Sequence, residues 1–264
     1  MLKSFVPNLL LGATLATQLP RVAIDTETLN FVEAQSGQRI VFHGQNVVVK
    51  VPPFIPQRQP FDVIKSLTDA EIVEMKAWGW NLVRLGVIWE AVETAPGVFD
   101  YEFLNEIEAL IDRLAEQGIY TIIDAHQDIF SHKFCGEGVP IFYTPEWDTL
   151  EHTCYNGSVL GVVLSLGGDC RPFNDWNIQV SLESGLPVQE ECAKQNFLKV
   201  HQAPEVASAF HQFWDNTNGL QDKFIDFWNV LAKKFVGNTN VLGYDMFNEP
   251  FTASMYEDMW IMLD

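Results

Sequence analysis

Four short apolar stretches of the chain predict buried β-strands. Each is rich in aliphatic, β-branched or aromatic side chains, and they are Gly44–Lys50, Asn81–Val87, Ile119–His126 and Val241–Phe247. Continuous apolar runs of this length are typical of strands covered on both faces, as in a parallel sheet. The last run is followed by Asn248-Glu249-Pro250, and proline cannot donate a hydrogen bond to a neighbouring strand. We therefore expect this strand to end at a carboxamide and a carboxylate.

Between these strands, apolar residues recur every three or four positions, which predicts amphipathic helices. Thr68 and Glu71 have the spacing of a capping box, so a helix is expected to begin there. A second helix is expected from Asp100, a favourable N-cap residue, to Gly118. A third helical stretch covers residues 205–235 and is broken near Gly219. Alternating strands and helices predict an α/β fold with a parallel sheet.

Three segments depart from this alternation. Residues 1–16 contain one lysine, an apolar stretch and small residues near Ala16, which predicts a signal peptide. Residues 29–43 contain two short strand patterns around a Gly-bearing turn, which predicts an N-terminal β-hairpin. Residues 135–204 lack periodicity and contain all four cysteines, so we expect an ordered insertion there. The leader and the sequon Asn156–Ser158 favour a secreted or lumenal location.

Composition narrows the possible partners. The chain has 264 residues, a net charge of −19 and only 16 Lys and Arg, so no nucleic-acid partner is expected. Most of its 8 Trp should be core residues, although Trp also stacks on sugars and apolar ligands. An even number of cysteines in an exported protein predicts two disulfides, and four cysteines allow three pairings. The sequence does not choose among these pairings.

Polar side chains gather where the predicted strands end. Arg84 interrupts the second strand, His126 and Asp128 follow the third, and Asn248 and Glu249 follow the fourth. The carboxyl ends of parallel strands share one edge of a sheet, and catalytic groups of α/β barrels lie there. We therefore expect these five side chains to converge.

Simpler interpretations of these residues stay open at this point. Arg84 could be the partner of a buried acid, His126 a hydrogen-bonded core histidine, and Asp128 a turn or helix cap. Lys50, near the end of the first strand, could be an ordinary loop lysine. No metal site is expected, because His126 has no second histidine or cysteine at ligand spacing.

Several segments resemble one known family of enzymes. Gly79–Arg84, Asp124–Asp128 and Phe247–Pro250 are similar, in this order, to the first half of a family 5 glycoside hydrolase. Other segments are closer to endoglycoceramidases than to cellulases, namely Asn46–Pro53, Trp89–Glu93 with Pro96-Gly97, and His126–Ser131. The resemblance implies a TIM (β/α)8 barrel, of which residues 44–264 supply about the first four strand–helix units.

The resemblance also implies roles for the residues at the strand ends. Glu249 matches the acid/base of the family, and Asn248 matches the residue that bonds the sugar 2-hydroxyl. Arg84 and His126 match the supporting cluster of the catalytic site. Glu249 is then expected to protonate the leaving oxygen first and to activate water afterwards.

Two further residues match positions particular to endoglycoceramidases. Asp128 and Lys50 resemble sugar-binding residues of these enzymes. The nucleophile of the family is a second glutamate after the seventh strand, so we expect it beyond residue 264 in a longer protein. The present residues alone are expected to be inactive.

The implied reaction is retaining hydrolysis of the β-linkage between oligosaccharide and ceramide. The expected substrate is a glycosphingolipid or another β-glycoside, with a membrane surface as its source, and no cofactor is expected. Two alternatives stay open: a family 5 glucanase or β-glucosidase acting on another β-glucoside, and a half-barrel that only binds sugar or glycolipid.

Overall fold

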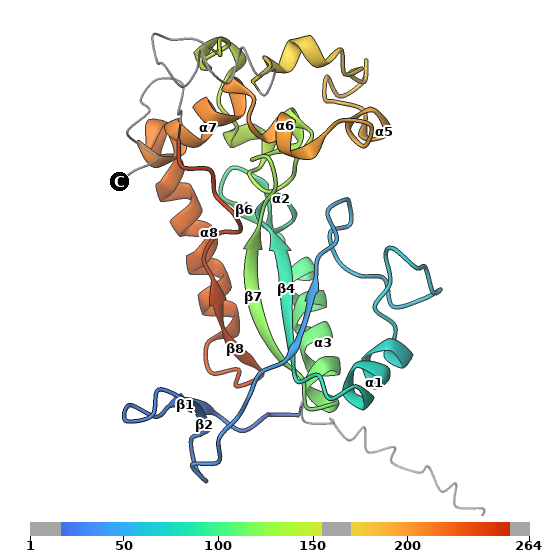
Figure 1. Cartoon of the computed structure of the whole chain (residues 1–264), viewed down its shortest axis with the longest axis vertical. Coiled ribbons are helices and arrows are strands. Elements are labelled where there is room, and N and C mark those ends of the chain that lie inside the picture. Colours follow the sequence, from blue (N-terminus) through green and yellow to red (C-terminus); the bar gives the residue numbers. More distant parts are fainter. Residues whose placement is uncertain (1–16, 155–169, 254–264) are drawn as a thin grey trace, which may run out of the picture.

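A four-stranded parallel sheet lies at the centre of the structure, in the order β3-β4-β7-β8 (Figure 1). This computed structural model describes residues 17–154 and 170–253, so the predicted signal peptide and the sequon lie outside the described residues. The strands are β3 (Gly44–Val47), β4 (Leu82–Ile88), β7 (Tyr120–His126) and β8 (Val241–Asp245). The four predicted strands are therefore confirmed, although β3 is shorter than predicted and β8 ends at Asp245 rather than at Asn248-Glu249. The sheet and its helices form part of a TIM (β/α)8 barrel.

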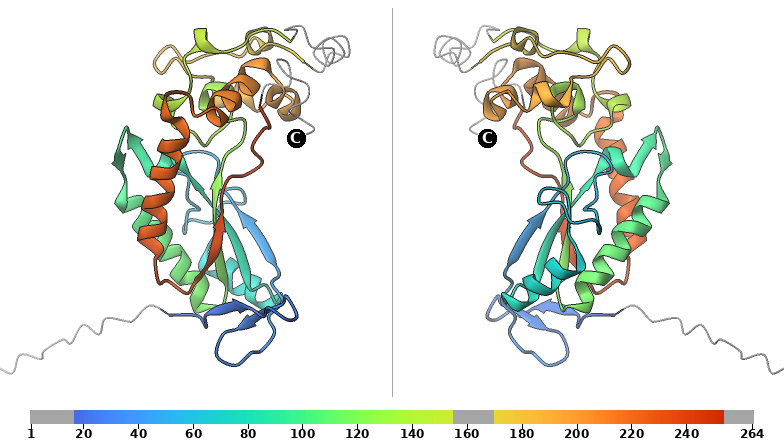
Figure 2. Two further views of the ribbon diagram at one scale, coloured as in Figure 1. Left: turned by 90° about the vertical axis from the view of Figure 1, so that its left-hand side faces the viewer. Right: turned by 90° about the vertical axis from the view of Figure 1, so that its right-hand side faces the viewer.

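The helices that alternate with these strands are also confirmed. They are α1 (Asp69–Ala77), α3 (Tyr101–Glu116) and α8 (Leu220–Phe235), and α3 and α8 lie side by side against one face of the sheet (Figure 2). The predicted capping box is present in α1, where Thr68 Oγ1 accepts from Glu71 N at 3.2 Å and Glu71 Oε2 accepts from Thr68 N at 2.7 Å. Gly118 follows α3 with φ +74°, a conformation that glycine adopts without strain.

The main core lies between the sheet and these helices. The α3 side chains that face the sheet are buried and follow the predicted stripe, namely Phe103, Leu104, Ile107, Leu110, Ile111 and Leu114. They share one cluster with buried residues of β4 and α8, such as Leu85 and Phe227. This packing fixes the strand ends that carry the polar residues.

The predicted N-terminal hairpin is only partly correct. The regular antiparallel partner of β2 (Phe31–Glu33) is β1 (Val22–Ile24), which precedes it. The predicted second strand contributes one isolated bridge, between Arg39 and Val32. The Phe42 ring packs on Phe31 of β2 with centroids 5.3 Å apart and on Tyr120 with centroids 5.7 Å apart, and so joins this region to the barrel.

The segment between β7 and α8 lies over the carboxyl ends of the strands (Figure 1). Its helices are short and comprise η1 (His132–Phe134), η2 (Ile141–Tyr143), η3 (Trp147–Thr149), η4 (Phe173–Trp176), α5 (Gln189–Cys192), α6 (Phe197–His201), α7 (Pro204–Trp214) and η5 (Thr217–Gly219). Two disulfides join this segment, Cys135–Cys192 and Cys154–Cys170, which confirms their number and settles the pairing. The predicted break near Gly219 separates α7 from α8.

A small substructure follows β4. Helix α2 (Trp89–Val92) leads into an antiparallel pair, β5 (Glu93–Ala95) and β6 (Val98–Phe99). Trp89 is buried, and its indole N–H donates to Glu93 Oε2 at 2.7 Å. Among the described residues, no helix has the length and apolar character needed to cross a bilayer.

Candidate active site

Arg84 joins the ends of three neighbouring strands. Its guanidinium lies 2.9 Å from Asp124 Oδ2 on β7 and 2.8 Å from Asp245 Oδ2 on β8. It also donates to Asn248 Oδ1 at 3.0 Å. The structure therefore brings Arg84 and Asn248 together, as predicted. The ion pair with Asp124 confirms the simpler interpretation of Arg84 as the partner of a buried acid.

Asp124 connects Arg84 to His126. Its side chain is fully buried, and Asp124 Oδ2 lies 2.7 Å from His126 Nδ1. A carboxylate can only accept hydrogen bonds, so Nδ1 carries the ring proton that faces Asp124. The second ring nitrogen, Nε2, has no hydrogen-bond partner among the described residues and lies 3.5 Å from Asp128 Oδ2. His126 is thus oriented by one acid and keeps one ring nitrogen without a hydrogen bond, unlike a fully satisfied core histidine.

The Asn248-Glu249 pair is held against the end of β7. Asn248 N donates to Ala125 O at 3.1 Å, and Asn248 Nδ2 donates to Gln127 O at 3.0 Å. In return, Gln127 Nε2 donates to the carbonyl oxygens of Asn248 at 2.5 Å and Glu249 at 3.2 Å. Glu249 has φ +38°, in the left-handed region that glutamate seldom occupies, and its side chain is exposed. These bonds fix the backbone that presents Glu249.

The inserted segment contacts the chain around Glu249. Burial lowers the pKa of His201, in α6, and the charge of Glu249 opposes this shift. The His201 ring also packs on Phe251, with centroids 5.1 Å apart, and Trp214 Nε1 donates to Phe251 O at 2.7 Å. Helices α6 and α7 therefore hold the residues that follow the candidate acid/base.

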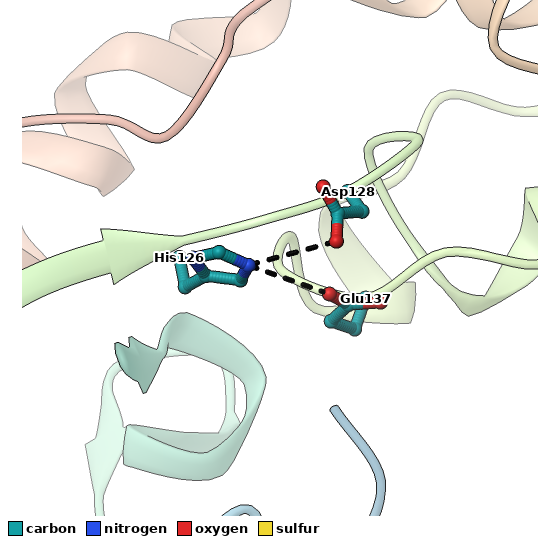
Figure 3. Close-up of side chains that lie close together, drawn as sticks. All are labelled: His126, Asp128 and Glu137. Carbon is teal, nitrogen blue, oxygen red and sulfur yellow. Dashed lines mark ion pairs between the residues drawn. The ribbon is translucent and has the colours of Figure 1, made fainter. Parts of the chain in front are cut away.

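The predicted sugar-binding residues form a second group beside His126. Lys50 Nζ pairs with Asp128 Oδ2, and it lies 3.9 Å from Glu137 Oε1. His126 Nε2 lies 3.5 Å from Asp128 Oδ2 and 4.0 Å from Glu137 Oε1 (Figure 3). Five of the six predicted residues, Lys50, Arg84, His126, Asp128 and Asn248, therefore form two groups that share His126. Glu249 reaches this edge of the sheet through its backbone, which accepts from Gln127, while its side chain is exposed.

Glu137 is the residue of this group that the sequence analysis missed. Its backbone pairs with that of Asp128 through Glu137 N to Asp128 O at 2.9 Å and Asp128 N to Glu137 O at 3.0 Å. The flanking glycines permit this close approach, since a Cβ on Gly136 would lie 1.8 Å from Asp128 O. A glutamate between two glycines was the available signal in the sequence. Asp124 and Asp245 were likewise missed as partners of Arg84.

The side chains of His126, Asp128 and Glu137 also provide the kinds of ligand that divalent cations take. The three donor atoms lie within 4.8 Å of one another. The expectation of no metal site rested on sequence spacing, which did not reveal these two carboxylates. The Lys50 ammonium already faces the group and balances part of its negative charge.

Burial changes the protonation of Glu137. Desolvation raises the pKa of its carboxyl from 4.5 to about 8, while the Lys50 ammonium opposes the rise and the Glu90 carboxylate adds to it. The folded state therefore binds a proton more tightly than the unfolded state. Stability that depends on this proton is present below about pH 4.5 and is lost as the pH rises through about 8.

Replacing Glu137 with glutamine should remove this pH dependence. Relative to wild type, we expect Glu137→Gln to raise the free energy of unfolding at pH 7 by about 1–3 kcal/mol, and to change it little at pH 4. Urea unfolding at both pH values measures this difference. Glu102→Gln, on the exposed face of α3, is the control and should behave like wild type at both. An equal effect of Glu137→Gln at pH 4 and pH 7 would show that its charge is not the cause.

Several known proteins are similar to this chain in sequence. The model of Cellulase (glycosyl hydrolase family 5) matches residues 56–156. An endoglycoceramidase of Cyanea nozakii is 31% identical over 243 residues, which cover 92% of this chain and 44% of that protein. An endoglycoceramidase of Hydra vulgaris is 28% identical over 242 residues, which cover 92% of this chain and 43% of that protein.

One solved structure has a similar fold over its matched part. Endo-glycoceramidase II from Rhodococcus sp., in an iminocyclitol complex, superimposes with a TM-score of 0.58 at 25% identity, over 82% of this chain and 41% of that one. This chain thus spans less than half the length of the relatives that it matches. Over the part of the barrel that it covers, it is similar to endoglycoceramidases and to family 5 glycosyl hydrolases.

Proposed function

We propose that the protein carrying this chain is a retaining glycosidase that cleaves the β-linkage between oligosaccharide and ceramide in glycosphingolipids. The observation that carries the proposal is the bond from Arg84 to Asn248 Oδ1, which fixes the residue before Glu249 at the carboxyl end of the sheet. The names of the Cyanea and Hydra relatives support the lipid substrate.

The proposed reaction has two steps. Glu249 gives its proton to the glycosidic oxygen while a second carboxylate, expected beyond residue 264, attacks the anomeric carbon and displaces ceramide. Glu249 then takes a proton from water, whose oxygen attacks the same carbon and releases the sugar with its original configuration. The two carboxyls of a retaining enzyme lie about 5–5.5 Å apart, which leaves no room for water in the first step.

The remaining groups are proposed to hold the sugar. Asn248 is positioned to bond the 2-hydroxyl, and this bond strengthens as positive charge develops on the ring. Lys50 and Asp128 offer a donor and an acceptor for other hydroxyls of the sugar. A membrane surface would supply the substrate, and two disulfides are consistent with a secreted or lumenal location.

This proposal predicts a defined pair of products. Full-length protein, expressed from the complete transcript, should convert lactosylceramide in detergent micelles into lactose and ceramide in equal amounts. Mass spectrometry of both products measures the cut. If the protein hydrolyses only soluble polysaccharides, or only monoglucosides of lipids, it is a glucanase or a β-glucosidase. Binding without hydrolysis would assign it to the non-catalytic alternative.

A further inference from the structure

Glu137 is held rigidly on the side of the site opposite His126. Its backbone exchanges two hydrogen bonds with Asp128, and Cys135, two residues earlier, is tied to Cys192. On its other side, Gly138 N donates to Glu90 Oε1 at 3.1 Å, and Glu90 N donates to Gly138 O at 3.0 Å. The backbone of Glu137 therefore has a fixed position.

Two buried polar atoms of the site face one another without a hydrogen bond. Glu137 Oε1 and His126 Nε2 are 4.0 Å apart, and neither has a hydrogen-bond partner among the described residues. Both side chains are more than nine-tenths buried. Leaving such atoms unpaired costs free energy, so a ligand that bonds both would bind favourably.

A hydroxyl group has the required bonding pattern. It can donate its hydrogen to His126 Nε2, whose other nitrogen is committed to Asp124. Its oxygen can accept from a protonated Glu137, or from Lys50 Nζ, which lies 3.9 Å from Glu137 Oε1. A distance of 4.0 Å is too long for a direct bond between Glu137 and His126, but one hydroxyl oxygen can bond both.

We propose that Glu137 is a substrate-recognition residue that, together with His126 and Lys50, binds one specific hydroxyl of the sugar. This inference rests on the proposed glycosidase function and adds a specificity determinant to its site. Glu137 contributes by donating a hydrogen bond, so its neutral form is the active one.

The charges around Glu137 determine when it can donate. Lys50 faces it from the segment after β3, His126 and Asp128 from the end of β7, and Glu90 from α2. Burial and the Glu90 carboxylate favour the neutral form, and Lys50 opposes them, with a resulting pKa of about 8. Above this pH, the ionised carboxylate no longer donates, so KM should rise as the pH passes through about 8.

The first test compares sugar analogues that each lack one hydroxyl. Full-length wild type, Glu137→Leu and the control Glu102→Gln are assayed on an aryl β-lactoside and on its monodeoxy derivatives. Glu137→Leu should raise KM for the unmodified aryl β-lactoside by about tenfold and change kcat by less than about threefold. For one deoxy analogue this effect should disappear, because the hydroxyl that Glu137 bonds is already absent. An equal rise in KM for every analogue would overturn the inference.

The second test uses pH and Glu137→Gln, which keeps a donor but cannot ionise. Wild-type KM should rise above about pH 8, whereas KM of Glu137→Gln should stay flat there. Identical profiles would contradict the proposed role. A requirement for Zn²⁺, shown by loss of activity in a chelator and recovery with the metal alone, would instead assign the group to a cation and overturn the inference.

If the glycosidase proposal itself is wrong, the same variants give a different and recognisable result. If wild type hydrolyses no β-glycoside, the glycosidase proposal fails, and calorimetric binding of lactose replaces the assay. Weaker binding by Glu137→Leu than by Glu102→Gln, restricted to sugars that keep one hydroxyl, would still support recognition by Glu137. Equal binding by both variants would overturn it.

Discussion

Replacing Glu249 with glutamine is expected to slow the hydrolysis of lactosylceramide by about 10²–10⁴-fold, because the alkoxide of ceramide leaves poorly without a proton. Glutamine keeps the shape of the side chain and its backbone contacts with Gln127, so folding should be unchanged. The rate is measured with full-length protein. Glu183→Gln changes an exposed glutamate of the inserted segment and should keep the wild-type rate.

The leaving group provides the discriminating comparison for Glu249. A dinitrophenyl lactoside releases an acidic phenol that needs little protonation, so the first step should be much less impaired in Glu249→Gln than it is with ceramide as the leaving group. Pre-steady-state release of the phenol measures this step. An equal loss for both substrates would mean that Glu249 does not act as the proton donor.

Replacing Arg84 with methionine is expected to lower the free energy of unfolding by about 3–5 kcal/mol. Asp124 is fully buried, and the substitution removes the cation that lies 2.9 Å from its carboxylate. Urea denaturation measures the change. Arg58→Met is the control, since the Arg58 side chain is 61% exposed and its guanidinium lies 2.6 Å from Asp69, which is half exposed; this substitution should change the free energy of unfolding little.

A second substitution separates this ion pair from simple packing. Adding Asp124→Asn to Arg84→Met removes the buried charge that had lost its partner, so part of the lost stability should return. Activity should not return, because Arg84 also holds Asn248 at 3.0 Å. If the double variant is less stable than Arg84→Met by the full cost of Asp124→Asn alone, the two charges are not coupled.

The elements that follow from local patterns were predictable from the sequence. The apolar stripe of α3 and the capping box of α1 are formed by residues three or four positions apart. The spacing of neighbouring residues in the sequence is therefore enough to predict them. The convergence of Arg84, His126 and Asn248 was also predictable, because parallel strands bring their carboxyl ends together. This rule holds whatever path the loops between the strands take.

Contacts that depend on the path of the loops were not predictable. Glu137 reaches Asp128 only because the chain after β7 turns back on itself through Ile129 and Phe130, which both have positive φ. The cysteine pairing likewise depends on how the inserted segment folds. In the N-terminal region, local strand patterns did not show that Val22–Ile24 would be the regular antiparallel partner of β2.

The proton-donor role of Glu249 has a direct chemical test with azide. In Glu249→Ala, the second carboxylate of the full-length protein should still form a glycosyl-enzyme from dinitrophenyl lactoside, and azide, which needs no general base, should attack it. We predict that azide accelerates turnover of the variant and yields β-lactosyl azide, with the configuration of the substrate retained. No acceleration by azide, or an α-lactosyl azide product, would contradict Glu249 as the acid/base of a retaining glycosidase.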